Sequence, residues 1–139
     1  MKLFKTKACL LAIALIAPLA QAEIAVIVHP SNAAAIDDAS ISRIFLGKLK
    51  SYPGGGQALP INQNEGSGAT GEFNSKVLKK SGSQLKAYWS KLVFTGKGTP
   101  PKAVASDAEV INLVSSNPNI IGYVDAGSVT GAVKVVAKY

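Results

Sequence analysis

Cysteine is nearly absent from this chain: the single residue, Cys9, lies in an apolar N-terminal run, and none follows it. A disulfide framework and a thiolate metal site are therefore excluded for the remainder of the sequence. Histidine is equally scarce, since His29 stands alone without companions at metal-ligand spacing. A lone histidine at the end of a strand is more often a surface or hydrogen-bonded residue. Stability must therefore come from packing.

Long apolar runs are missing beyond the N-terminus, and no later segment approaches the roughly 20 residues needed to span a bilayer. At the N-terminus, lysines precede an apolar run over residues 8–17, and Ala20-Gln21-Ala22 follows it. This pattern is typical of a secretory signal peptide. We expect a leader over 1–22, a single domain over 23–139 and a periplasmic location without a membrane span.

Acidic residues are few, and Arg43 is the only arginine. Twelve basic and eight acidic residues follow the expected leader, so the basic excess is modest. A solvated helix face is the commoner explanation for clustered lysines, although their field also attracts small anions. The lysines of one helical region and its following loop are Lys76, Lys79, Lys80, Lys86, Lys91, Lys97 and Lys102. Charge this dilute on an exported chain argues against nucleic acid as a partner.

The patterning after the leader alternates between strands and helices. Residues 24–28 form a continuous β-branched run, typical of a strand buried on both faces. In the helix expected over 83–94, Tyr88 and Trp89 lie on an apolar stripe and are expected in the core. Further strands are expected over 59–62, 120–124 and 133–137, helices over 38–46, 70–80 and 106–116, and loops over 48–57 and 95–104. The order predicts an α/β fold with one compact lobe and a largely parallel sheet flanked by helices.

One stretch, residues 61–73, turns from a strand through Gly66, Gly68 and Gly71 into a helix. Glycines let a backbone approach a bound group closely, and the first amides of a helix have no internal partner. Together they form a ready anion site. A flexible strand-to-helix turn explains the glycines equally well from this stretch alone.

Hydroxyl groups surround the same turn. Ser67 lies inside it, and Thr70 is placed to be the N-cap of the following helix. Ser31, which follows the first strand, is expected to converge with them, because α/β proteins bind ligands at the carboxyl ends of their strands. Hydroxyls and amides can hold an oxyanion without a formal positive charge.

Other functions of the glycine turn are excluded, because the chain lacks the residues that they need. The glycines match the dinucleotide fingerprint, but no acidic residue lies between Glu72 and Asp107 to bind a ribose. A nucleophile elbow needs glycine at the position of Glu65. The chain offers no base, nucleophile or metal-ligand set, so we expect neither an enzyme nor a cofactor.

Five motifs, in the same order along the chain, resemble the phosphate-binding proteins of ABC transporters. They are Val26–Asn32, Ile44–Lys48, Glu65–Gly68, Ala87–Gly98 and Asn117–Val124. The resemblance covers nearly all of residues 23–139 and is nearest to short, exported members of about this length. It implies a type 2 periplasmic-binding-protein fold, here reduced to a single lobe.

The anion motif of that family is similar to R-x-D-G-S-G-T, in which the arginine, serine, glycine and threonine contact phosphate. Ser67 and Gly68 match it, whereas Gln63 stands where arginine is expected and Ala69 where threonine is expected. Losing the guanidinium weakens the expected binding, because charge-assisted hydrogen bonds are the strong ones. Together with the turn itself, the resemblance implies a ligand-binding set of Gln63, Gly66, Ser67, Gly68, Thr70 and Ser31.

These observations predict a periplasmic solute-binding-like protein that recognises phosphate or a related small oxyanion in support of ABC-type uptake or sensing. Its expected partners are that oxyanion and an inner-membrane ABC transporter or membrane sensor. The alternative is a non-catalytic periplasmic interaction or adaptor module that kept the fold and lost the solute. Gln63 and the missing second lobe favour the alternative, because a half-cleft leaves the anion in water, where its contacts are weaker.

Overall fold

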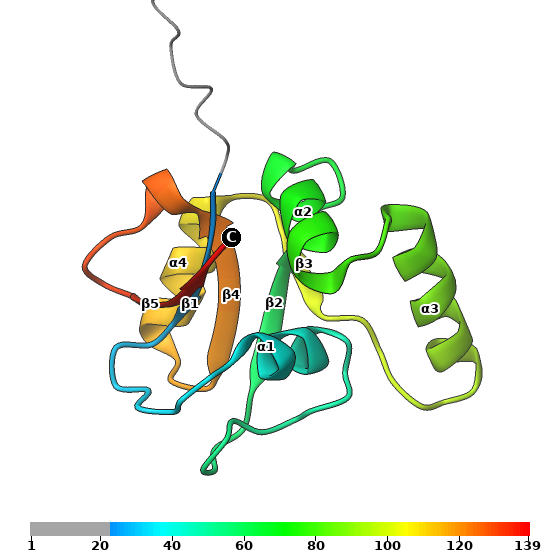
Figure 1. The fold of residues 1–139 in the computed structure, drawn as a ribbon, viewed down its shortest axis with the longest axis horizontal. Coiled ribbons are helices and arrows are strands. Elements are labelled where there is room, and N and C mark those ends of the chain that lie inside the picture. Colours follow the sequence, from blue (N-terminus) through cyan, green and yellow to red (C-terminus); the bar gives the residue numbers. More distant parts are fainter. Residues whose placement is uncertain (1–22) are drawn as a thin grey trace, which may run out of the picture.

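A five-stranded sheet with helices on both faces forms the centre of the molecule (Figure 1). The computed structural model describes residues 23–139, so the predicted leader lies outside the described part. The elements in chain order are β1 (Ile24–Val28), α1 (Asp38–Phe45), β2 (Leu59–Gln63), α2 (Gly68–Phe73), the π-helix η1 (Asn74–Leu78), α3 (Gly82–Phe94), β3 (Lys102–Val104), α4 (Asp107–Ser116), β4 (Ile120–Asp125), the 3-10 helix η2 (Ala126–Ser128) and β5 (Lys134–Lys138). The α/β fold class is confirmed.

The strand directions are mixed. The strand order is β3-β2-β4-β1-β5, in which β2 runs parallel to β3 and β4. Strand β1 is antiparallel to both β4 and β5. The expectation of a largely parallel sheet therefore holds for only half of the sheet. β3 was not predicted at all, because its residues lie in the expected loop 95–104.

Strand β1 is buried on both faces, as its continuous apolar run predicts. Its alternate side chains enter two separate cores, because successive side chains of a strand point to opposite faces. One core lies under α1 and α2 and includes Phe45, Phe73 and Tyr123, with the last two rings stacked 4.0 Å apart. The other lies under α4 and includes Val110 and Val114. The two cores fix the helices on either side of the sheet.

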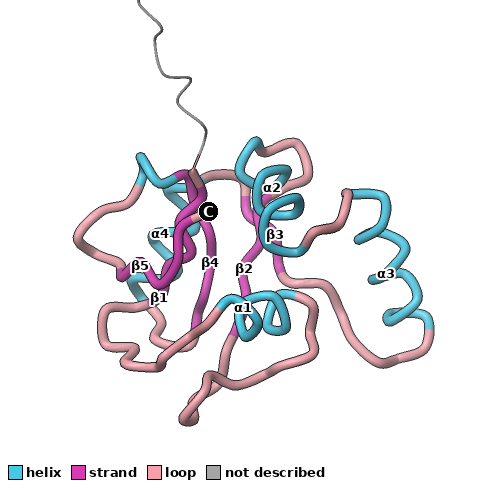
Figure 2. The backbone as a smooth tube through the Cα atoms, viewed as in Figure 1, coloured by secondary structure: helices cyan, strands magenta, loops and turns pink. Residues whose placement is uncertain are grey.

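Helix α3 lies to the side of the sheet, beyond strand β3 (Figure 2), and reaches the core under α1 and α2 only through Leu85 and Tyr88. Of its residues only Leu85 is buried, whereas Tyr88 and Trp89 are half-buried. The expectation that Tyr88 and Trp89 lie in the core therefore holds only in part, because Tyr88 packs against the core under α1 and α2 and Trp89 belongs to neither core. The Tyr88 hydroxyl donates to the backbone oxygen of Leu46 at 2.6 Å, and the Trp89 ring lies over Gly47, where an added Cβ would come within 3.1 Å of it. These two aromatic side chains attach α3 to the end of α1.

Within residues 23–139, no helix is both long enough and apolar enough to cross a membrane. The longest, α3, has 13 residues.

Candidate functional site

The carboxyl ends of the three parallel strands meet at one edge of the sheet. Strand β2 ends at Gln63, β3 at Val104 and β4 at Asp125. Helix α4 begins immediately after β3, which places Asp107 at the same edge. This edge is where α/β sheets bind ligands, and it carries the predicted glycine turn.

Gln63 is the centre of a buried polar network at this edge, with 3% of its surface exposed. Its Nε2 donates to Asp107 Oδ1 at 2.7 Å and to the backbone oxygen of Tyr123 at 3.0 Å. Both of these partners can only accept, so the side-chain amide is oriented with Oε1 towards the turn. Ser67 Oγ donates to that Oε1 at 2.8 Å. The family motif has an arginine at this position, which can only donate, whereas Gln63 presents the acceptor Oε1 to the turn.

Asp107 and Ser128 complete the network. The Ser128 hydroxyl donates to Asp107 Oδ2 at 2.7 Å, and the Asp125 backbone N–H donates to the same oxygen at 3.3 Å. The side chains of Gln63, Ser67, Asp107 and Ser128 thus form a continuous hydrogen-bonded chain across the ends of β2 and β4. These side chains satisfy one another's hydrogen bonds, which lowers the free-energy cost of burying polar groups.

Thr70 fastens the turn to the sheet instead of capping the helix. Helix α2 begins at Gly68 with Ser67 as its N-cap residue, so the prediction of Thr70 as N-cap is wrong. Thr70 is buried, with 4% of its surface exposed, and its hydroxyl donates to the backbone oxygen of Asn64 at 2.8 Å. The Ser67 side chain accepts no hydrogen bond from the helix, and its hydroxyl donates to Gln63 instead.

The fold does not require glycine at any of the three glycine positions of the turn. None of Gly66, Gly68 and Gly71 has a positive φ, and a Cβ added to any of them meets no atom within 4 Å. Within residues 23–139, the backbone N–H groups of Gly68 and Ala69 donate to no acceptor. The turn therefore combines unbonded amides with room beside its glycines, an arrangement that lets a small anion approach the backbone.

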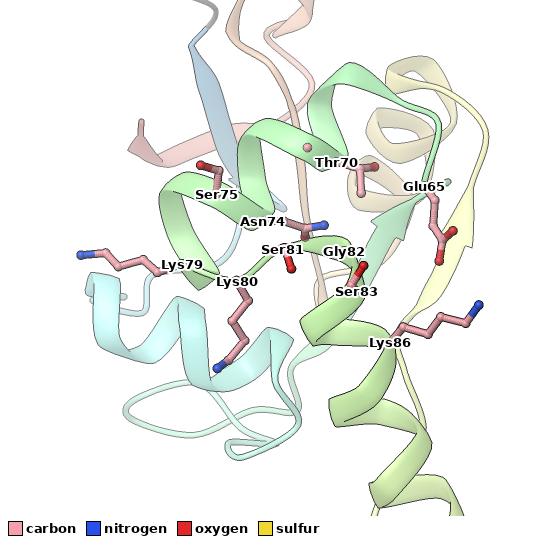
Figure 3. A pocket seen from close by; sticks show the side chains of 11 residues that line it. Glu65, Thr70, Asn74, Ser75, Lys79, Lys80, Ser81, Gly82, Ser83 and Lys86 are labelled. Carbon is pink, nitrogen blue, oxygen red and sulfur yellow. The ribbon is translucent and has the colours of Figure 1, made fainter.

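A pocket of about 890 Å³ opens beside the turn (Figure 3). Its wall contains Thr70 and Gly71 of α2, the start of α3 at Ser81 and Ser83, and Lys86. Figure 3 shows Lys79 extending away from the other labelled side chains. The remaining residues of the wall are Glu65, Asn74, Ser75, Lys80 and Gly82. Three lysines against one glutamate give the pocket a basic character.

Ser31 is not part of this site. Strand β1 is antiparallel to β4, so its carboxyl end lies at the opposite edge of the sheet from Gln63. There the Ser31 hydroxyl is hydrogen-bonded to His29 Nδ1 at 2.7 Å. The structure thus brings together Gln63, Gly66, Ser67, Gly68 and Thr70, and it separates Ser31 from them.

Sequence reasoning missed Asp107, Ser128 and Tyr123. Tyr123 lies beneath the turn, where its hydroxyl accepts from the Gln63 backbone N–H at 3.1 Å, and burial raises the pKa of its phenol. Asp107 follows a strand for which the sequence predicts a loop, so the local pattern does not place it at this edge. Among the described residues, no group of three metal-ligating side chains comes together.

No family model and no curated protein sequence matches the chain. Among solved structures, it is similar to an ABC-type phosphate transport receptor from Vibrio cholerae, with a TM-score of 0.63 and 18% identity over 83% of this chain and 46% of that one. It is also similar to a phosphate ABC transporter substrate-binding protein with bound phosphate from Clostridium perfringens, with a TM-score of 0.60 and 20% identity over 83% and 45%. PstS from Borrelia burgdorferi gives a TM-score of 0.60 and 18% identity over 84% and 47%. The chain therefore shares the fold of part of these proteins and spans less than half of their length.

Proposed function

We propose that the turn over Gly66–Gly71 binds phosphate or a related small oxyanion, and that the protein is a single-lobed, non-catalytic solute-binding module of the cell envelope. A leader over 1–22 directs it to the periplasm, where it supports ABC-type uptake or sensing. The single observation that carries the proposal is the turn itself: three glycines that the fold does not require, next to unbonded amides at Gly68 and Ala69. The solved structures of similar fold, one of which holds phosphate, support the choice of anion.

Each residue of the turn has a distinct role in this proposal. The amides of Gly68 and Ala69 donate to the anion, and the hydroxyl of Ser67 rotates from Gln63 to join them. Thr70 holds the turn in place through its bond to Asn64. Gln63 orients Ser67 but supplies no positive charge, so we expect weaker binding than an arginine would give.

Calorimetry on residues 23–139 with phosphate and with sulfate tests the proposal. We expect heat of binding in the millimolar range or below, and a clear loss of affinity in Ser67→Ala. Ser31→Ala is the matched control, because it removes the same group at the opposite edge of the sheet. Absence of binding for both anions at millimolar concentration overturns the proposal, as does an equal effect of the two serine variants.

The second candidate is an interaction or adaptor module that has lost the solute. The observation that favours it is the network around Gln63, which is complete without a ligand. Calorimetric silence combined with recovery of one specific envelope protein supports this candidate. Clear anion binding with no recovered partner counts against it.

A further inference from the structure

Helix α3 projects from the side of the molecule (Figure 1), and its last turn carries exposed apolar side chains. Phe94 is 90% exposed and its neighbour Val93 is 52% exposed. Trp89 and Leu92 on the same helix are only half-buried. Single exposed apolar residues are normal on a protein surface, but several on one projecting helix form a patch that needs a partner.

Carboxylates are absent from the chain segments that form this end. No aspartate or glutamate occurs in residues 39–64 or 73–106. Eight lysines of these segments make no ion pair within residues 23–139, and five of them lie near this end: Lys48, Lys50, Lys91, Lys97 and Lys102. A surface of this kind attracts a partner with many negative charges.

The lysines and the apolar side chains share the same surface. Lys48, Lys50 and Lys97 line one pocket together with Trp89 and Val93. Lys50 and Lys102 line a neighbouring pocket that also contains Trp89. These lysines therefore lie beside Trp89 and Val93 of the apolar patch. Phe94 lines a further pocket, which it shares with Val93, Lys86 and Glu65. We call this surface the α3 tip; it consists of the C-terminal half of α3, the loop 95–101 and the lysines named above.

We propose that the α3 tip binds the surface of an anionic lipid bilayer. Phe94 and Val93 enter the boundary between head groups and acyl chains, and the neighbouring lysines reach lipid phosphates while their aliphatic stems cover apolar surface. A second copy of the chain is disfavoured, because it would bring two sets of lysines together. A free anion is too small to cover Phe94. An acidic polypeptide has the required charge, but a projecting, exposed side chain fits a flat bilayer better.

Sedimentation with lipid vesicles tests this proposal on residues 23–139, which contain the entire sheet and both cores. We expect the protein to sediment with vesicles of phosphatidylglycerol and phosphatidylcholine in equal parts. It stays in solution with vesicles of phosphatidylcholine alone, and added sodium chloride weakens the binding. Trp89 is the only tryptophan of the sequence and lies at the α3 tip, so its emission moves to shorter wavelength on binding.

Three variants separate the apolar contribution to vesicle binding from the electrostatic one. Phe94→Ser weakens vesicle binding about tenfold, because one apolar side chain no longer leaves water. Lys91→Gln combined with Lys97→Gln weakens it about thirtyfold at low salt. Lys134→Gln combined with Lys138→Gln is the matched control. It removes the same charge from β5, which lies at the opposite edge of the sheet from α3. We expect this control to change vesicle binding by less than about threefold, because distant charges are screened.

This test does not depend on whether the glycine turn binds an oxyanion. Wild-type protein that stays in solution with phosphatidylglycerol vesicles overturns it and leaves an acidic polypeptide as the occupant of the α3 tip. An equal loss of binding in the two double-lysine variants also overturns it, since charge alone would then explain the binding. Ser67→Ala binds vesicles like wild type, so a failure of phosphate binding does not affect this test.

Discussion

Replacing Gln63 with arginine changes the hydrogen-bonding character of the glycine turn. In the wild type, Gln63 Nε2 donates to Asp107 and to the Tyr123 backbone oxygen, while Oε1 accepts from Ser67. A guanidinium has donors only, so it can keep both acceptors and place an N–H where Oε1 stands. The substitution therefore turns an acceptor beside the turn into a charged donor and releases the Ser67 hydroxyl.

The expected gain follows from the hydrogen bonds that become available. One bond from a charged donor is worth about 1.5–3 kcal/mol. The lower end applies here, because the pocket beside the turn is open to water and Asp107 already neutralises part of the charge. We therefore expect Gln63→Arg to bind phosphate about tenfold more tightly than the wild type.

The same substitution has a structural cost. Gln63 is 3% exposed, and a longer side chain in a filled space lowers the free energy of unfolding by about 1–3 kcal/mol. Urea unfolding of each variant measures this cost before binding is compared. Gln63→Met is the control, since it has a similar volume and neither donates nor accepts in the same way.

Calorimetry with phosphate and sulfate on the wild type, Gln63→Arg and Gln63→Met completes the experiment. The arginine variant should bind most tightly, and its advantage should shrink as salt is added. A Gln63→Arg protein that unfolds cooperatively and binds phosphate no better than the wild type refutes the reasoning, because it shows that the turn is not the anion site.

Three further predictions concern the scaffold. Gly122→Ala places a Cβ 2.5 Å from a methyl of Val110, so we expect the free energy of unfolding in urea to fall by about 1–3 kcal/mol, and an unchanged value contradicts the packing of α4 on β4. Burial raises the pKa of Tyr52 from 10.0 to about 12, so the stability from this group is complete below about pH 10 and is lost as the pH rises towards 12; Tyr52→Phe should flatten that part of a stability-versus-pH curve. Ser81→Ala removes the capping box of α3 and should destabilise the helix by about 1 kcal/mol, seen as faster amide hydrogen exchange in α3 alone.

Local patterns predicted most of the elements. The β-branched run of β1, the apolar spacing of α1 and the S-x-x-E capping signal of α4 each describe an element through its own residues. The glycine turn was predicted for the same reason, since a strand, three glycines and a helix follow one another directly. Strand β3 was not predicted, because it has only three residues and follows two prolines in a glycine-rich stretch.

The directions of the strands and the packing partners of the helices could not be predicted from local patterns. The direction of β1 decides that Ser31 lies away from Ser67, and that direction depends on pairing with β4, far along the chain. The apolar stripe with Tyr88 and Trp89 predicted a helix correctly, but periodicity does not say what the stripe packs against. The partners of Gln63 illustrate the same limit: Asp107 comes from a strand-helix junction that the pattern did not reveal.

The pairing of β1 also sets the order in which the protein is assembled. This strand is made before every other strand of the sheet, yet its two neighbours, β4 and β5, are made last. Its five buried residues therefore have no strand partner until the ribosome has released residues 120–138. Pairing over so long a separation is slow compared with local helix formation. The topology thus prevents the two cores from closing before residues 120–138 have been made.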